Sequence, residues 1–364
     1  MSALAPQDMP SFAITFTVKN EWDLLQFALP YFEAIGVARV YLFWDQTTDE
    51  APEEVKAFNF VEARDCVSLD EIKTPGRWLS ELKPETHMDH RKRLNTMFAA
   101  QEAHRAGINW ISCIDPDEIL LPNEGDASLR ASLAAIPEDV DQIIVPNLEV
   151  FPVPREDENP FRSQTLFINR MERVDAIWRY VGAGLSRVLS PRHVAFWRHT
   201  LFRFVTAGKF PPKMTNPLTG TPIHRSLYLG YNNCKSFMRS GRAPLYNYNI
   251  HKWVAIDEAP KSIKGGRVLH YYFPSYAYFI KKFRQRPSNM RLKVFDTPYQ
   301  LGEISRNASR EMSKIFFEQQ ICCSDPAATQ ALLDRGIITQ ISDVSDVFDR
   351  LHKDTPSTSD PITS

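Results

Sequence analysis

The chain has 364 residues, enough for one large domain or two of ordinary size, and its 43% hydrophobic and 24% charged residues are normal for a soluble globular protein with a sizeable core. Its five cysteines show no CxxC spacing, and no apolar run approaches the roughly 18 residues of a membrane span. The N-terminus also lacks the basic and apolar regions of a signal peptide. We therefore expect a cytoplasmic protein with reduced thiols and no disulfide framework.

The net charge of −1 hides an asymmetry along the chain. Residues 1–197 carry 19 Lys and Arg against 31 Asp and Glu, a net of −12. Residues 198–310 carry 20 against 4, a net of +16, and residues 311–364 carry 4 against 9, a net of −5. A basic block of this size indicates a polyanionic partner, an interface with the acidic half of the same chain, or both.

The first half of the chain alternates between strand and helix patterns. Residues 12–18 are rich in β-branched and aromatic side chains and predict a strand. Apolar residues at helical spacing follow from Trp22 to Ile35 and end at Gly36, and Pro30 should kink or split this helix. Further strands are predicted at 37–44, 60–65, 110–114 and 142–151, and a helix with capping-box-like spacing is predicted from Thr86 to Gly107.

Strands that read as continuous apolar runs separated by helices predict an α/β fold with a mostly parallel sheet buried on both faces. In such sheets, ligands bind at the carboxyl ends of the strands. The sequence therefore places Lys19–Glu21, Asp45 and Asp115–Glu118 along one edge of the sheet.

Regularity fades beyond residue 151. Residues 152–165 and 207–222 are polar or rich in proline and predict loops, the first being either an acceptor-side lid or a surface insertion. Helical patterns return at 276–284, 303–321, 326–335 and 342–352, and the polar residues 353–364 predict a disordered tail.

The stretch NWISCIDPDEILLP, residues 109–122, places three acids directly after an apolar strand. Asp115 and Asp117 can both point at one hard cation, and Mg²⁺ or Mn²⁺ prefers carboxylate oxygens together with substrate phosphates. Pro116 disfavours the α region for Asp115 and so keeps it extended at the strand end. The alternative is a set of solvated or helix-capping acids, but the preceding strand, Glu118 and the basic block favour a metal site.

A second class of metal-dependent enzymes also uses strand-end aspartates. In haloacid-dehalogenase-like phosphatases the DxD follows the first strand and is continued by Thr or Val. Here the acids follow about four elements and continue as Glu118-Ile119, which argues against that class.

Several segments resemble the bacterial family 2 glycosyltransferases, in the branch near family 92. VKNEWDLLQFALPYFEAIGVARVYLFWDQTTDE resembles their KNE, amphipathic helix, GV, strand and D-N-x-S-x-D series, and WISCIDPDEIL resembles W-x-x-x-x-D-x-D-E-F. CKSFMRSG resembles a K-S-x-x-R element, HKW the H-R or H-K that follows it, and VLHYYFPSYAYFIKKFRQR the closing H-Y motif. The motifs span residues 18–286 in the family's order, and the ordered set is more specific than any single member.

The resemblance implies a GT-A fold, a UDP- or GDP-sugar donor, Mn²⁺ or Mg²⁺, and inverting transfer to a saccharide or lipid-linked acceptor in cell-envelope or surface polysaccharide synthesis. Asp115 and Asp117 would bind the metal, with His270 as third ligand unless it only packs among its aromatic neighbours, and His251 as its substitute. The candidate donor-contacting residues are Lys19, Asn20, Glu21, Asp45, Arg91, Asn95, Lys235, Arg239, His251, Lys281 and Arg284.

Inverting transfer also needs a carboxylate that takes the acceptor's proton. Glu149, at the end of the strand predicted over 142–149, is the first candidate, followed by Asp157 and Glu118. Glu118 alternatively braces the turn that holds the two aspartates.

On this interpretation, residues 1–300 form the GT-A-like domain, with a nucleotide-sugar-binding half at 10–125 and an acceptor half at 126–300. A helical segment at 301–352 follows. The chain departs from the family pattern at Pro116 in the acidic motif, at Ile119 in place of an aromatic residue, and at Pro274 and Tyr276–Tyr278 in the closing motif. These departures bear on acceptor contacts and specificity.

The competing interpretation is a non-catalytic anion- or nucleic-acid-binding protein that uses the basic block at 198–310. The overall pI near 6.8 and the lack of a recognisable nucleic-acid-binding module favour the enzyme, so no nucleic-acid partner is expected. The block also suits peripheral contact with anionic lipid at the inner face of a membrane, where a lipid-linked acceptor would be found.

Overall fold

The computed structural model describes residues 9–72, 81–154, 158–169, 214–223, 234–285 and 297–354. The chain divides into two compact units. Unit 1 comprises residues 1–147, 233–270 and 347–364, and unit 2 comprises residues 148–232 and 271–346. The expected division into donor-binding and acceptor halves is a functional one and stays a prediction.

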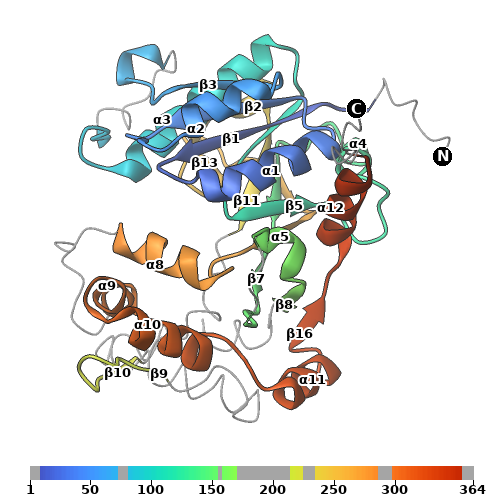
Figure 1. Ribbon diagram of the computed structural model, residues 1–364. Coiled ribbons are helices and arrows are strands. Elements are labelled where there is room, and N and C mark those ends of the chain that lie inside the picture. Colours follow the sequence, from blue (N-terminus) through green and yellow to red (C-terminus); the bar gives the residue numbers. More distant parts are fainter. Residues whose placement is uncertain are drawn as a thin grey trace, which may run out of the picture. The chain divides into compact units, whose positions relative to one another are not determined.

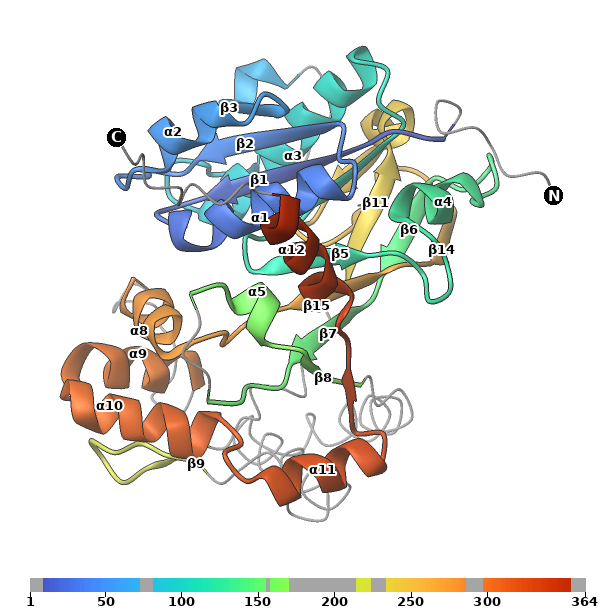
Figure 2. The ribbon, with the colours of Figure 1, turned by 45° about the vertical axis from the view of Figure 1, so that its right-hand side comes forward.

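Unit 1 is built on a seven-stranded sheet within the described residues. The spatial order of the strands is β14 (Ser262–Lys264), β6 (Gln142–Val145), β11 (Lys235–Arg239), β4 (Trp110–Cys113), β1 (Phe12–Val18), β2 (Arg39–Trp44) and β3 (Val61–Asp65). The pairings of β1 with β2 and β4, of β2 with β3, and of β14 with β6 are parallel, whereas β11 is antiparallel to both of its neighbours. Figure 2 shows β6, β11 and β14 side by side. The expected α/β fold with a mostly parallel sheet is confirmed.

Two helices cover opposite faces of this sheet, α1 (Trp22–Ala34) and α3 (Met88–Arg105) (Figure 1). Successive strand residues point to opposite faces. Accordingly, Ala13 of β1 belongs to the apolar cluster that includes the α3 side chains, whereas the Phe16 ring contacts Phe32 of α1 with 5.9 Å between centroids. Burial on both faces explains why every residue of β1 is buried.

Both helices end as the sequence predicts, at a glycine. Gly36 and Gly107 have φ values of 82° and 73°, a region that costs glycine little. After α3, the Gly107 N–H donates to the His104 carbonyl and the Ile108 N–H to the Ala103 carbonyl, which is the Schellman pattern.

Three predicted boundaries differ from the structure. Pro30 does not split α1, because the buried face of that helix packs well enough to offset one missing hydrogen bond. Helix α3 begins at Met88 and not at Thr86, since the Thr86 N–H donates to the Lys83 carbonyl in a preceding turn. The strand expected at 142–151 is interrupted at Pro146, which gives β6 and then β7 (Asn147–Val150).

The rest of unit 1 consists of short elements. β5 (Glu118–Leu121) pairs antiparallel with β15 (Arg267–His270), and β12 (Tyr246–Tyr248) pairs antiparallel with β13 (Trp253–Ala255). The short helices are α2 (Ala51–Glu54) and α4 (Leu129–Ala134).

Unit 2 combines short strands with helices. β7 and β16 (Ile338–Gln340) both pair antiparallel with β8 (Leu166–Ile168), and β9 (Met214–Thr215) pairs with β10 (Pro222–Ile223). Its described helices are α5 (Pro160–Ser163), α8 (Tyr276–Arg284), α9 (Thr297–Asn307), α10 (Arg310–Phe316), α11 (Pro326–Asp334) and the start of α12 (Asp343–Asp354). Helix α5 lies within the stretch that the sequence analysis expected to be a loop. Helix α10 continues into a short π-helical segment. Aromatic side chains of α8 and α10, among them Phe279 and Phe316, fill the core of unit 2.

All five cysteines are free thiols in the structure. No helix in the described part of the chain is both long and apolar enough to cross a membrane. The predicted tail falls almost entirely on residues outside the described ones.

Replacing Phe32 with alanine should remove the ring contact between α1 and Phe16 of β1. Because Phe32 is fully buried, we expect the free energy of unfolding in urea to fall by about 3–5 kcal/mol. Leu245→Ala, at a side chain that is 53% exposed, is the control and should change it by less than about 0.5 kcal/mol. Equal effects of the two substitutions would contradict the packing described for α1.

Candidate functional site

The carboxyl ends of three parallel strands of unit 1 meet at one edge of the sheet. Val18 at the end of β1 pairs with Trp44 at the end of β2, and Thr15 pairs with Cys113 at the end of β4. The segments that follow these strands are Lys19–Glu21, Asp45 and Asp115–Glu118. The prediction that they share one edge is therefore confirmed.

Asn20 connects two of these segments. Its φ is 54°, and its Oδ1 accepts hydrogen bonds from the backbone N–H groups of Thr48 at 2.6 Å and Asp49 at 3.2 Å. Lys19 Nζ donates to Gln46 Oε1 at 3.3 Å, and the Glu21 carbonyl accepts from the first turn of α1. The KNE segment thus fixes the loop after β2 relative to the end of β1.

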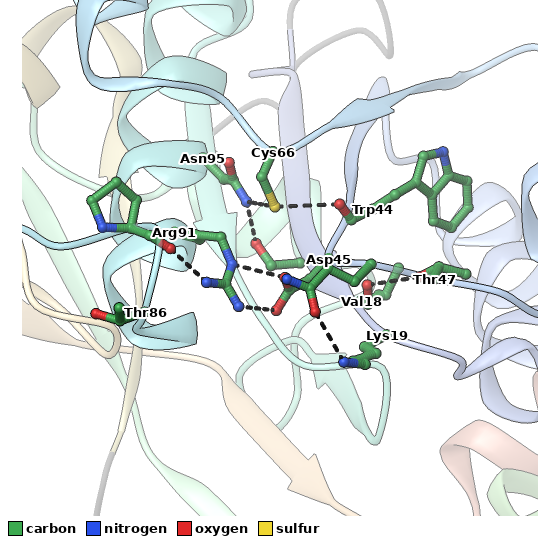
Figure 3. Close-up of polar contacts among 12 residues, drawn as sticks. Val18, Lys19, Trp44, Asp45, Thr47, Cys66, Thr86, Arg91 and Asn95 are labelled. Atoms are coloured by element: carbon green, nitrogen blue, oxygen red, sulfur yellow. Dashed lines mark hydrogen bonds and ion pairs between the residues drawn. The ribbon is translucent and has the colours of Figure 1, made fainter. Parts of the chain in front are cut away.

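A bidentate ion pair joins α3 to the end of β2 (Figure 3). Arg91 donates from Nε to Asp45 Oδ1 at 2.7 Å and from Nη2 to Asp45 Oδ2 at 3.0 Å, while Nη1 donates to the Pro84 carbonyl. The Asp45 side chain is almost fully buried. The guanidinium supplies the counter-charge that a carboxylate at this depth requires.

Asn95 lies one turn further along α3 and is completely buried. Its Nδ2 donates to Cys66 Sγ (Figure 3) and to Thr17 Oγ1 at 2.9 Å. Its Oδ1 accepts from the Val67 N–H at 3.0 Å. Both ends of the amide are therefore occupied. This corrects the sequence interpretation, because Asn95 holds the sheet edge together and is not exposed to a donor.

The acidic turn after β4 is closed by a reciprocal pair of hydrogen bonds. The Glu118 N–H donates to the Asp115 carbonyl at 2.9 Å, and the Asp115 N–H donates to Glu118 Oε2 at 2.8 Å. Pro116 and Asp117 occupy the two central positions. Glu118 thus braces the turn that holds the two aspartates, which was the alternative to its being the catalytic base.

Two buried lysines converge on Asp115. Lys92 of α3 donates to Asp115 Oδ1, and Lys235 of β11 donates to Asp115 Oδ2 at 2.7 Å and contacts Glu118 Oε2 at 2.8 Å. Burial alone would raise the pKa of Asp115, but the ammoniums of Lys235 and Lys92 outweigh it and hold that pKa well below its usual range. Burial likewise works to lower the pKa of Lys235, but the carboxylates of Asp115 and Glu118 hold it well above its usual range.

The side chain of Asp117 faces that of His270, which belongs to the neighbouring strand β15. Its Oδ2 lies 3.6 Å from His270 Nε2, and both side chains are almost fully buried. The antiparallel pairing of β5 with β15 sets His270 directly opposite Glu118, which explains this placement. An oxygen and a nitrogen at this separation suit two ligands of one cation, which lie roughly 3–4 Å apart when each bond is about 2.1 Å. Among the residues that the structure describes, no group of three or more His, Cys, Asp or Glu converges as a metal site.

His251 lies in the turn between β12 and β13, after Ile250 with a φ of 69°. Its Nδ1 is buried and has no hydrogen-bond partner among the described residues. Burial, assisted by the ammoniums of Lys235 and Lys92, lowers the pKa of His251 to about 4. The imidazole is therefore neutral at pH 7.

The remaining residues that the sequence analysis proposed for the site do not lie beside the acidic turn in unit 1. The backbone of Arg239 pairs with that of Trp110 at the start of β4. The Arg239 guanidinium lies 4.3 Å from the centre of the Trp110 ring, and its Nε donates to the Val140 carbonyl. It therefore belongs to the opposite edge of the sheet from Asp115, which corrects its assignment as a phosphate contact. Glu149, Lys281 and Arg284 belong to unit 2, where Arg284 donates to the Ser305 carbonyl, and Asp157 lies outside the described residues.

Lys92 is the site residue that the sequence interpretation missed. It falls in line with Thr96, Ala99 and Ala103, which are buried and spaced by four, three and four residues. A lysine that continues a stripe of small buried residues on a helix was the available signal.

Comparisons with known proteins point to one class. No family model matches the chain. Two Arabidopsis thaliana proteins, each named Glycosyltransferase-like, are 25% identical over 69% of this chain and 23% identical over 85% of it. The chain spans 44% and 66% of their respective lengths. This protein is similar to glycosyltransferase-like proteins.

A solved structure of UDP-glucose pyrophosphorylase complexed with UDP-glucose covers 44% of this chain and 67% of its own, at 9% identity. The TM-score is 0.21, so this likeness carries no argument about fold or ligand.

The Asp45–Arg91 pair should be strongly coupled in a double-mutant cycle of Asp45→Asn and Arg91→Met. Because both side chains are largely buried, we expect a coupling free energy of about 2–3 kcal/mol in urea unfolding. The matched cycle at the more exposed pair Arg39–Glu62 should give less than about 1 kcal/mol. The result would count against the described geometry if the two couplings were alike.

His251 should titrate near pH 4 in an NMR experiment on the folded protein. Because an unperturbed histidine titrates near 6.5, the unfolded chain binds this proton first. The resulting contribution to stability is complete above about pH 6.5 and is lost as the pH falls toward 4. His251→Gln should remove that part of the pH dependence in urea unfolding, whereas His87→Gln, at an exposed position, should not. A midpoint near 6.5 would show that the imidazole is not buried against these lysines.

Proposed function

We propose that this protein is a metal-dependent glycosyltransferase that moves a sugar, with inversion, from a UDP- or GDP-sugar to a hydroxyl of a saccharide or lipid-linked acceptor. The observation that carries the proposal is the acidic turn Asp115–Glu118 at the carboxyl edge of a parallel sheet, beside Asp45 and the KNE segment. The names of the two relatives and the ordered motifs of the sequence support the same class. Polysaccharide synthesis at a cell surface is the pathway that the motifs suggest.

The nucleoside would bind along this edge. Lys19, Asn20 and Glu21 follow β1, and Asp45 follows β2, with Arg91 orienting its carboxylate. Ligands of open α/β sheets bind outside the carboxyl ends of the strands, which supports this placement. The exposed Lys19 ammonium is available for the negative charge of the diphosphate.

Asp117 and His270 would hold the metal, and the remaining positions would be filled by oxygens of the donor. A divalent cation bound there supplies charge to the leaving diphosphate. The buried setting of both side chains strengthens such electrostatic stabilisation, since it is screened less than in water. Asp115, predicted as a further ligand, is held by the two lysines.

In the proposed reaction the acceptor oxygen forms a bond to the anomeric carbon, and the bond from that carbon to the diphosphate oxygen breaks. The nucleoside diphosphate leaves with the electron pair, and a carboxylate takes the acceptor's proton. Glu118 is occupied by the Asp115 N–H and by Lys235, which leaves Glu149 and Asp157 as the base candidates.

A panel of UDP- and GDP-sugars with Mn²⁺ or Mg²⁺ tests this function by thermal shift and by release of the nucleoside diphosphate. At a ligand concentration of about 100 Kd, binding adds about 2.7 kcal/mol of stability, so Tm should rise by several degrees. Asp117→Asn should abolish the metal-dependent part of the shift and lower turnover by at least about 100-fold.

Asp139→Asn is the matched control, because Asp139 is an exposed aspartate paired with Lys261, and it should behave as the wild type. The competing function, an anion- or nucleic-acid-binding protein, predicts the reverse outcome. No response to any nucleotide, together with nucleic-acid binding that weakens with salt, would refute the glycosyltransferase proposal.

A further inference from the structure

Strand β5 leads the chain out of the acidic turn and is buried along its whole length. It begins at Glu118, the last residue of the turn, and β15 pairs with one of its edges. Among the strands that the structure describes, none pairs with the other edge. An edge strand leaves backbone carbonyls without ladder partners, and a buried carbonyl needs a hydrogen bond from another group. This edge of β5 therefore needs a donor from another element.

Tyr31 of α1 supplies such a hydrogen bond. Its hydroxyl donates to the Leu120 carbonyl at 3.0 Å, two residues after Glu118. Tyr31 is only 1% exposed, so water does not replace the hydroxyl if the bond is lost, and the carbonyl then stays unsatisfied in the interior. Helix α1 begins directly after the KNE segment. One helix thus connects that segment with the strand that follows the acidic turn.

The C-terminal helix α12 packs on this tyrosine. The Phe348 ring lies 6.0 Å from the Tyr31 ring, centroid to centroid, and Phe348 is almost fully buried. The chain enters unit 1 at Val347, so both rings belong to that unit. Aromatic pairs at this distance attract each other beyond the effect of their buried area. The contact restricts the Tyr31 side chain, which aims its hydroxyl at β5.

The acidic turn is thereby held at both of its ends. Two lysines bind Asp115 at its start, while β15 and Tyr31 hold the strand at its end. The reciprocal hydrogen bonds between Asp115 and Glu118 close the turn only while its two ends keep their separation. Because Asp117 lies between these ends, freedom at the β5 end also displaces its carboxylate.

We propose that Tyr31 and Phe348 are positioning residues for the acidic turn, so that the C-terminal helix α12 controls the geometry of the site through the hydrogen bond from Tyr31 to Leu120. Phe348 holds the phenol ring, and the phenol holds the start of β5 beside β15. Both side chains act through β5 and not by contact with a substrate. The effect on catalysis rests on the proposed function, whereas the effect on the turn does not.

Hydrogen exchange of backbone amides tests this role without any ligand. The Asp115 and Glu118 amides report on the turn, since each donates a hydrogen bond that closes it. The Val40 amide, which donates to the Phe60 carbonyl at 2.9 Å, is the reference. Tyr31→Phe removes only a hydroxyl and should speed exchange at the turn about tenfold relative to the reference, a change of about 1.4 kcal/mol in local stability.

Three further variants accompany this one. Tyr41→Phe is the matched control, because it removes a hydroxyl from a buried ring on the sheet face that α3 covers, and it should leave the exchange ratio unchanged. Phe348→Ala should raise the ratio as Tyr31→Phe does. Phe58→Ala breaks a similar aromatic pair, with Phe60 at 6.2 Å, and should not raise it.

The double variant Tyr31→Phe with Phe348→Ala tests whether the two residues act in series. Because both substitutions act on one hydrogen bond, the double variant should exceed the stronger single variant by less than about twofold in the exchange ratio. Circular dichroism and urea unfolding establish that each variant is folded.

Turnover is the second measurement. Under the proposed function, Tyr31→Phe and Phe348→Ala should each lower kcat for sugar transfer by about tenfold, because the acidic turn loses its fixed geometry. Tyr41→Phe should leave kcat unchanged.

Four results would overturn the inference. The first is equal acceleration of the turn amides and Val40 in Tyr31→Phe, which would show a general loss of stability. The second is unchanged exchange in folded Phe348→Ala, and the third is full additivity in the double variant. The fourth is unchanged kcat in a variant whose turn amides exchange faster. If the wild type transfers no sugar but the exchange pattern is as expected, the positioning of the turn is supported and the proposed function is refuted.

Discussion

The ion pairs of Lys235 tie the acidic turn to the sheet, and the rest of the site depends on them. This buried ammonium lies against the carboxylates of Asp115 and Glu118 and so joins β11 to the turn after β4. Removing the Lys235 charge would leave the buried carboxylate of Glu118 without the ammonium that contacts it, which costs several kcal/mol. The antiparallel placement of β11 beside β4 brings Lys235, at the start of β11, to the edge where β4 ends.

Helix α3 contributes two adjacent cations to two different strands. Arg91 pairs with Asp45 after β2, and Lys92 pairs with Asp115 after β4. One rigid helix thereby sets the distance between the segment expected to bind the nucleoside and the acidic turn. Asn95, one turn later, adds contacts to β1 and to the segment after β3. Side chains of α3 thus contact β1 and the segments that follow β2, β3 and β4.

The basic block is in part neutralised within the chain. Lys235 contacts Asp115 and Glu118, Arg242 approaches Asp141 at 3.6 Å, and Lys261 pairs with Asp139. These pairs join residues of the +16 segment to residues of the acidic half. Within the described residues, these pairs involve three cations of the block, so part of the asymmetry has an intramolecular role.

The sequence by itself determined the order of the main strands and helices in the first half of the chain, the mostly parallel sheet, the glycine stops and the edge that gathers the acids, because these follow from local periodicity and from the rule for strand ends. Only the tertiary structure decided that Lys92 joins the acids, that Arg239 lies at the opposite edge and that Asn95 is enclosed. Those outcomes depend on which strand pairs with which, and in which direction. Residues far apart in the chain meet through β11, and no local pattern encodes that pairing.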